Sequence, residues 1–191
     1  MNKMLKPIIC AIILFTSCVS FGQDKNYELE ATYMNCMYGI FEDDGAELKE
    51  LIKNAEQKLV AAKLLKDTSG ESYIALFKNI EKAVDGRISS LGVSDHVIEG
   101  MSDKVKVKEN MTCMQVMMKS ENFEGSKLSK LIQLSSSGSS NPKITAITEK
   151  LLLIFEAKDF DHDFYKYLTF SLIDKFNTAN KKQSNPPKGQ N

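Results

Sequence analysis

The chain has 191 residues, of which 42% are hydrophobic, and it carries 25 basic and 25 acidic side chains. This length fits one ordinary domain with its own core. Charge is balanced and the only adjacent lysines are Lys181 and Lys182. Nucleic acid is therefore not expected as a partner, because it selects a concentrated positive surface.

The first residues have the pattern of a secretory leader. Lys3 and Lys6 precede an unbroken apolar run over 8–15, and a more polar stretch of small residues ends at Gly22. This order is typical of a signal peptide, and the apolar run is too short to span a bilayer. The sequence therefore predicts a signal peptide over 1–22 and export to the periplasm or the cell exterior.

Cys18 leaves an alternative open. Phe15-Thr16-Ser17-Cys18 resembles a loose lipobox, so processing at this cysteine would give a lipidated outer-membrane protein. A membrane is expected as a partner only in that case. Cleavage after Gly22 instead removes two of the 25 basic residues and no acid, which leaves 23 basic residues against 25 acidic ones.

Two cysteines follow the predicted leader, Cys36 and Cys113. Exported proteins usually meet an oxidising compartment, so a disulfide between these two residues is predicted. The bridge would close a loop of about 77 residues, which the chain-entropy model equates with about 4 kcal/mol at most.

Hydrophobic spacing predicts helices in the first part of the mature chain, because apolar residues recur three and four positions apart. The predicted helices cover 26–41, about 46–65 and about 70–84, separated by turn sequences at 42–45 and 67–71. Residues 86–100 are turn-rich, with at most a short helix near 94–99. Val105 and Val107 alternate with lysines, which predicts a short strand before a helical, methionine-rich stretch over 111–118.

The second part continues the helical pattern. Helices are predicted over 126–134, 142–156 and about 158–178, with a serine-rich connector at 135–140. The helix at 142–156 is the most hydrophobic and is expected at the centre. Residues 180–191 are predicted to be a disordered tail. We therefore expect an all-α fold, with one compact bundle of five to seven helices over 23–179.

Sulfur-containing residues form one candidate metal site. Met34-Asn35-Cys36-Met37 resembles Met111-Thr112-Cys113-Met114, and these side chains would offer soft ligands for Cu(I) if the two segments packed together. The alternative is a disulfide surrounded by methionines that fill the core.

A second candidate metal site is Asp159, His162 and Asp163. These residues lie at i, i+3 and i+4, so one face of a helix would present all three. Acidic residues in the first turn of a helix also complement its dipole without any metal.

Two segments are similar to parts of small exported proteins of Bacteroidetes, some of which are labelled biopolymer-transport proteins, the accessory class of TonB-type systems. They are Leu64-Leu65-Lys66-Asp67-Thr68-Ser69-Gly70-Glu71-Ser72-Tyr73 and Ala157-Lys158-Asp159-Phe160-Asp161-His162-Asp163-Phe164-Tyr165-Lys166. The resemblance implies an accessory role in envelope transport as an alternative function. Members of that class keep an uncleaved membrane anchor that contains an acid, whereas the run over 8–15 is short and has none.

The sequence favours a non-enzymatic periplasmic or surface module that binds an unknown envelope protein and needs no cofactor. Such a module should combine a packed helical core with an exposed apolar patch. A soft-metal binder is a further alternative. An enzyme would instead require a deep pocket that gathers Asp159, His162 and another titratable group.

Overall fold

The structure, a computed structural model, describes residues 27–86, 88, 90–136 and 143–184. The predicted leader over 1–22 and Cys18 lie outside these ranges, as do residues 185–191 of the predicted tail. The described residues are helical and contain no strand, which confirms the all-α class. They form eight α-helices and two short 3-10 helices: α1 (Glu28–Tyr38), α2 (Ala46–Ala61), α3 (Gly70–Lys78), η2 (Ile80–Ala83), α4 (Val93–Gly100), α5 (Lys104–Met118), α6 (Lys127–Ser136), α7 (Ile144–Leu151), η3 (Ala157–Asp161) and α8 (Asp163–Ser184).

The predicted count of five to seven helices is too low, because α4 forms in a stretch that was expected to be mainly turns. Two predicted elements also differ. The stretch predicted as one helix over 70–84 is interrupted at Asn79, whose φ of −129° and ψ of 29° end α3 before η2 begins. The strand predicted around Val105 and Val107 is wrong, because both residues lie in the first turns of α5. The side chain of Asp103 accepts hydrogen bonds from the backbone N–H groups of Val105 and Lys106, which starts the helix.

The last helix also differs from its prediction at both ends. Residues 157–161 form η3, and His162 has extended backbone, so α8 begins only at Asp163. At the other end α8 continues to Ser184, past the predicted start of the tail at residue 180.

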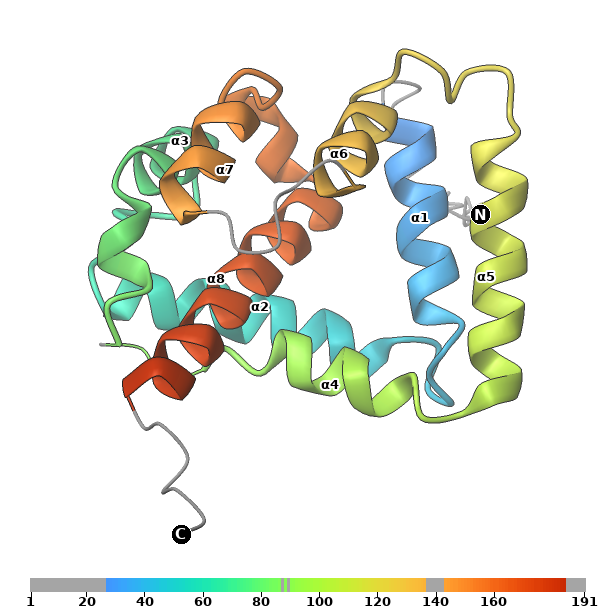
Figure 1. The fold of residues 1–191 in the computed structure, drawn as a ribbon, viewed down its shortest axis with the longest axis horizontal. Helices are drawn as coiled ribbons and strands as arrows, with labels where there is room; N and C mark the ends of the chain where they lie inside the picture. The colour runs from blue at the N-terminus through green and yellow to red at the C-terminus, as the bar shows by residue number, and fades with distance from the viewer. Residues whose placement is uncertain (1–26, 87, 89, 137–142, 185–191) are drawn as a thin grey trace, which may run out of the picture.

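Helix α8 is the central element, and the expectation that 142–156 would occupy this place is wrong (Figure 1). α8 contacts α1, α2, α4 and η3, and its Phe164, Tyr165, Phe170 and Ile173 are all buried. α7 ends early, at Leu151, and Leu153 just after it is 88% exposed. The apolar residues of 142–156 are thus divided between a short helix and a turn.

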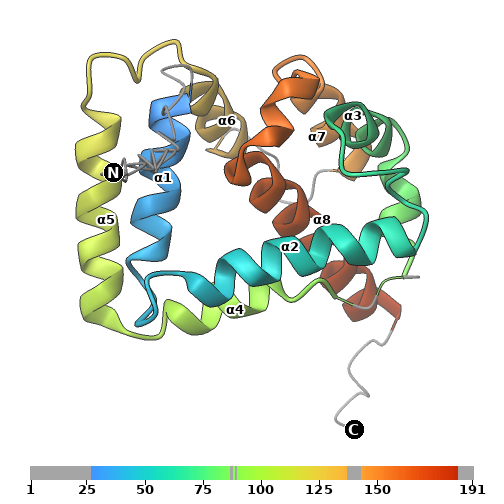
Figure 2. The same cartoon turned by 180° about the vertical axis from the view of Figure 1, so that it is seen from behind.

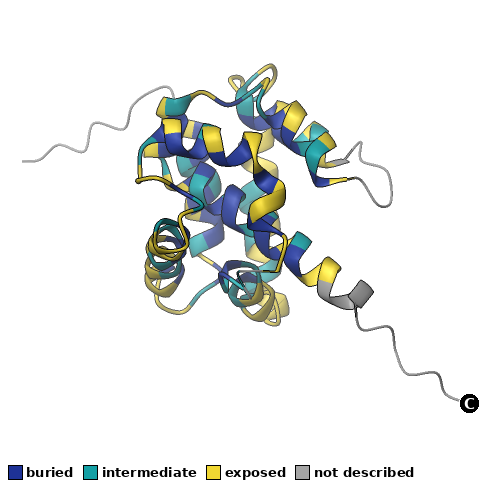
Figure 3. Cartoon of the chain, turned by 90° about the vertical axis from the view of Figure 1, so that its left-hand side faces the viewer, coloured by how far each residue is buried: buried dark blue, intermediate teal, exposed yellow. Residues whose placement is uncertain are grey.

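Aromatic rings fill the core between α3, α8 and the segment that joins α7 to α8. The ring of Phe160 stacks on Tyr73 with centroids 4.6 Å apart and meets Phe155 edge-on at 5.5 Å. Such offset and edge-to-face pairs add to the stabilisation from apolar burial. Figure 3 shows buried segments facing inward from several helices around this centre.

Helices α1 and α5 form an antiparallel pair at one side of the molecule, and the same pair is visible from behind (Figures 1 and 2). α1 also contacts α8, so it connects α5 to the body of the protein. α5 therefore lies at the periphery, and its outer side is exposed to solvent.

Candidate interaction surface

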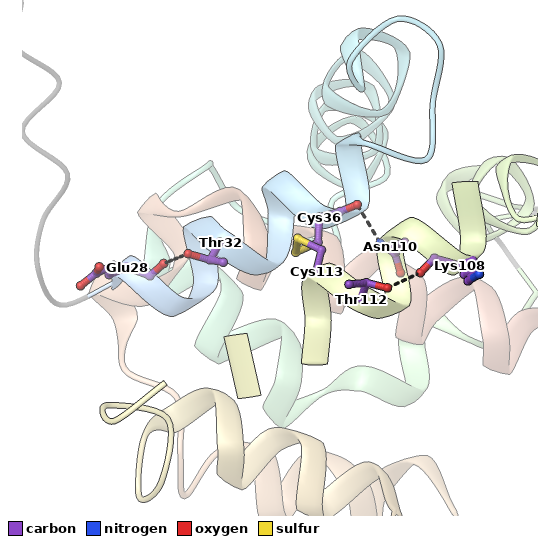
Figure 4. Close-up of a disulfide and its surroundings, with 7 residues drawn as sticks. All are labelled: Glu28, Thr32, Cys36, Lys108, Asn110, Thr112 and Cys113. Atoms are coloured by element: carbon purple, nitrogen blue, oxygen red, sulfur yellow. Dashed lines mark hydrogen bonds between the residues drawn. A yellow bond between two sulfur atoms is a disulfide. The ribbon is translucent and has the colours of Figure 1, made fainter. Parts of the chain in front are cut away.

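The α1–α5 pair is held together by the bond between Cys36 and Cys113. Their Cα atoms are 5.7 Å apart, a usual separation for a disulfide, and the predicted pairing is present in the structure. Cys36 is buried at 3% exposure, whereas Cys113 is half-buried. Figure 4 shows the bridge between the two helices.

The inner side of α5 makes two further attachments. The side-chain amide of Asn110 donates a hydrogen bond of 2.7 Å to the carbonyl oxygen of Cys36 (Figure 4). Met117 is buried at 3% exposure, and Met114 packs partly against the core. These residues recur three or four positions apart, so a single face of α5 joins the body of the protein.

The rest of α5 presents apolar side chains to solvent. Of the seven large apolar residues exposed among the described residues, six lie between Ile98 and Met118. Four of these belong to α5 itself, and their exposures are 66% for Val105, 56% for Met111, 67% for Val116 and 40% for Met118. Single exposed apolar residues are common on proteins, but a concentration on one helix is typical of an interaction site.

A positively charged ridge runs along the same outer side. It consists of residues spaced by three or four positions, all exposed, and we refer to it as the lysine ridge: Lys104, Lys108, Thr112, Gln115 and Lys119. Three of the five residues are lysines and none is acidic. The outer side of α5 therefore combines apolar contact area with positive charge, the two properties that a peptide-binding or helix-binding surface uses.

The sulfur residues proposed as a copper site are not arranged as one. Cys36 and Cys113 are bonded to each other and cannot act as thiolate ligands in this form. Met34 and Met37 are each buried at 2% exposure, whereas Met111 is 56% exposed. The remaining residue of the set, Met114, packs partly against the core.

The second candidate metal site, Asp159, His162 and Asp163, is divided by the break between η3 and α8. Asp159 is fully buried and already has protein partners at both carboxylate oxygens. Lys127 donates to the two oxygens at 2.8 and 2.9 Å, and the hydroxyl of Tyr27 donates at 2.8 Å. The backbone N–H of Glu156 adds a fourth bond of 2.7 Å, in a capping box at the start of η3.

His162 is occupied differently. Its Nδ1 accepts a hydrogen bond of 3.1 Å from the backbone N–H of Phe164, which caps the first turn of α8. Burial lowers the pKa of His162, although the charges of Asp163 and Glu30 act in the opposite direction. Within the described part of the chain, no three histidine, cysteine, aspartate or glutamate side chains gather closely enough to hold a metal ion.

A pocket of about 650 Å³ lies between the end of α2 and the start of α3. Its lining includes Asp67, Ser69 and Ser72. The hydroxyls of the two serines donate to Asp67 and lower its pKa to about 2. Ser69 in turn caps α3 by accepting from the backbone N–H of Ser72. These polar groups stabilise the start of a helix, which accounts for their presence in this pocket.

Comparison with known proteins adds no assignment. Family models, curated proteins and solved structures were each searched, and none matches this chain. Among the helices that the structure describes, none has the length and apolar character needed to cross a membrane.

Two features of this surface and its surroundings were not predicted. No sequence pattern indicates that Lys127 pairs with Asp159, because the two residues are 32 positions apart. Helix α5 did carry a signal in its sequence, because Val107, Met111, Met114 and Met118 are spaced by four, three and four residues. That spacing is the one expected of a helix that offers an apolar stripe to another helix.

Proposed function

We propose that this protein is an exported, non-enzymatic interaction module whose envelope partner docks on α5. One observation carries this proposal: α5 is fastened to the body along one side, while Val105, Met111, Val116 and Met118 remain exposed on the others. Full burial of a large apolar side chain stabilises a protein by roughly 1.5–3 kcal/mol. These side chains lack part of that contribution while they are exposed to water. A partner that covers them recovers this stabilisation.

The neighbouring polar residues support binding rather than chemistry. An enzyme would need Asp159 and His162 free to act on a substrate. Asp159 instead links the start of α1, α6 and η3 through Tyr27, Lys127 and the backbone of Glu156. His162 holds the first turn of α8. Asp159 and His162 therefore both have structural roles that account for their positions.

Site-specific photo-crosslinking in the native cells tests the docking role. A benzophenone side chain placed at Gln115, an exposed position of the lysine ridge, should give a discrete adduct with another envelope protein. The same group at Gln57, an exposed position on α2, serves as the matched control and should give none. Equal adducts at both positions, no adduct at Gln115, or an adduct of two copies of this chain would contradict the proposal.

Export is tested separately by the intact mass of the protein recovered from cells. Cleavage after Gly22 predicts a chain that begins at Gln23 and carries no lipid. A mass that retains residues 1–22 would contradict export through a cleaved leader. A mass that begins at an acylated Cys18 would establish the lipoprotein alternative.

A further inference from the structure

Helix α5 has the sequence pattern of one helix in a two-helix coiled coil. Val107, Met111, Met114 and Met118 follow the alternating spacing of the d and a positions of a heptad, and we refer to them as the methionine stripe. Met111 and Met118 are exposed, whereas Val107 and Met114 are half-buried and Met114 also packs partly against the core. The stripe therefore follows the border between the attached side and the outer side of α5. The stripe spans about three helical turns.

The lysine ridge borders this stripe directly. Lys108 lies three residues before Met111, and Gln115 lies three residues before Met118, so each polar residue neighbours an exposed methionine on the helix surface. In heptad terms Lys108 and Gln115 occupy e positions, whose charges set the choice of partner helix. Glu109 lies on the other flank of the ridge, with Val105 and Val116.

From this arrangement we infer that the partner docks on α5 through an acidic amphipathic helix. Its apolar face covers the methionine stripe, and its carboxylates face Lys104, Lys108 and Lys119. This inference rests on the proposed docking role of α5 and specifies the chemistry of the partner. Methionine suits such a contact, because its flexible thioether adapts to the shape of the opposing side chains.

Two other occupants fit the surface less well. A second copy of the chain would oppose one lysine ridge to another, and the ridge contains no acid to compensate. A lipid surface requires one continuous apolar face on the helix. On α5 the lysine ridge instead separates the methionine stripe from Val105 and Val116, so a membrane would have to bury the lysines to reach both flanks.

Synthetic helices test the inference on the purified mature protein. The probe is a peptide of three heptads with leucine at a and d and glutamate at e and g. A matched peptide has lysine at e and g. Fluorescence anisotropy should show the acidic peptide binding about tenfold more tightly than the basic one, with the difference shrinking as salt is added.

Variants then locate the contact. Lys108→Glu should remove or reverse the preference for the acidic peptide, and Met111→Gln should weaken the binding of both peptides. Lys53→Glu makes the same charge change at an exposed position on α2 and should leave the preference unchanged. Circular dichroism of each variant confirms that it is folded.

Any other result of these experiments overturns the inference of an acidic partner. Such a result can be told apart from a failure of the docking role itself. Equal binding of the two peptides, or no binding of either, would show that the partner is not an acidic helix. If crosslinking at Gln115 persists, α5 still docks a protein of different chemistry. Self-association by sedimentation that Met111→Lys abolishes would assign the surface to a second copy. Binding to phosphatidylglycerol vesicles that depends on Lys108 would assign it to lipid.

Discussion

Cys36 is attached to α5 twice, because Asn110 donates a hydrogen bond of 2.7 Å to its carbonyl oxygen while Cys113 is bonded to its sulfur. The carbonyl lies in the last turn of α1, where carbonyl oxygens have no N–H donor from their own helix. Asn110 supplies that donor from the opposite helix. The disulfide and the hydrogen bond, three residues apart on α5, therefore fix both the position and the rotation of this helix (Figure 4).

Removing the disulfide should loosen α5 before the rest of the protein. We expect the double variant Cys36→Ser, Cys113→Ser to lose roughly 2–4 kcal/mol in the free energy of unfolding, mainly because the unfolded chain gains freedom. Amide hydrogen exchange should rise most in α5, whose main neighbour is α1. Exchange that rises equally in α5 and α8 would contradict the peripheral attachment described here.

The hydrogen bond from Asn110 should contribute measurably beside the disulfide. Asn110→Asp keeps the shape of the side chain but replaces its donor with an acceptor that faces the carbonyl of Cys36. We expect a loss of about 1–3 kcal/mol in urea unfolding, since a carbonyl oxygen loses its partner. Thr112→Ser is the control, because it retains the hydroxyl that donates to Lys108 within the same helix. A loss no larger than that of the control would show that the bond is dispensable.

The sequence predicted most of the helices because their apolar spacing is local, and it predicted the disulfide because only two cysteines follow the predicted leader. The prediction from sequence failed where tertiary contacts or a single capping residue determine the structure. Asp103 starts α5 across a stretch whose Val-Lys alternation favours a strand. The central place of α8 depends on contacts with α1, α2 and α4, which no local pattern encodes.

The candidate surface shows the same limit. The methionines of α5 were recognised in the sequence, but as metal ligands or core residues. Spacing alone does not reveal which face of a helix is buried when apolar residues lie on several faces, as they do in α5. Only the position of Cys113 and Met117 against the body shows that Met111 and Met118 lie on the outer side.

Replacing Lys127 should destabilise the protein, because this lysine forms an ion pair with the buried Asp159. Lys127→Met leaves the Asp159 carboxylate, which is fully buried, without its cationic partner. We expect a loss of about 3 kcal/mol in the free energy of unfolding. Lys130→Met changes an exposed lysine on the same helix and should have little effect. Similar losses in both variants would show that lost charge, and not the ion pair, is responsible.

Gly70 should tolerate no side chain. A Cβ atom at this position would lie 1.8 Å from the carbonyl oxygen of Ala157, where α3 meets η3. Gly70→Ala should therefore force the two elements apart and lower the free energy of unfolding by about 1–3 kcal/mol. Gly39→Ala is the matched control, since its φ is −64° and its Cβ would meet only ordinary contacts. The control should be neutral or slightly stabilising, and the reverse order of the two variants would contradict the close approach at Gly70.

Stability should fall at mildly acidic pH because of His162. Burial lowers the pKa of this imidazole below 6.5 in the folded protein, so between the folded and unfolded pKa values the unfolded chain binds more protons. The contribution of neutral His162 is therefore complete above pH 6.5 and is lost as pH falls through the folded pKa. Glu30 and Asp163 oppose the shift but do not reverse it. The thermal midpoint of His162→Gln should depend less on pH across this window than that of the wild type, and identical slopes would show that another group titrates there.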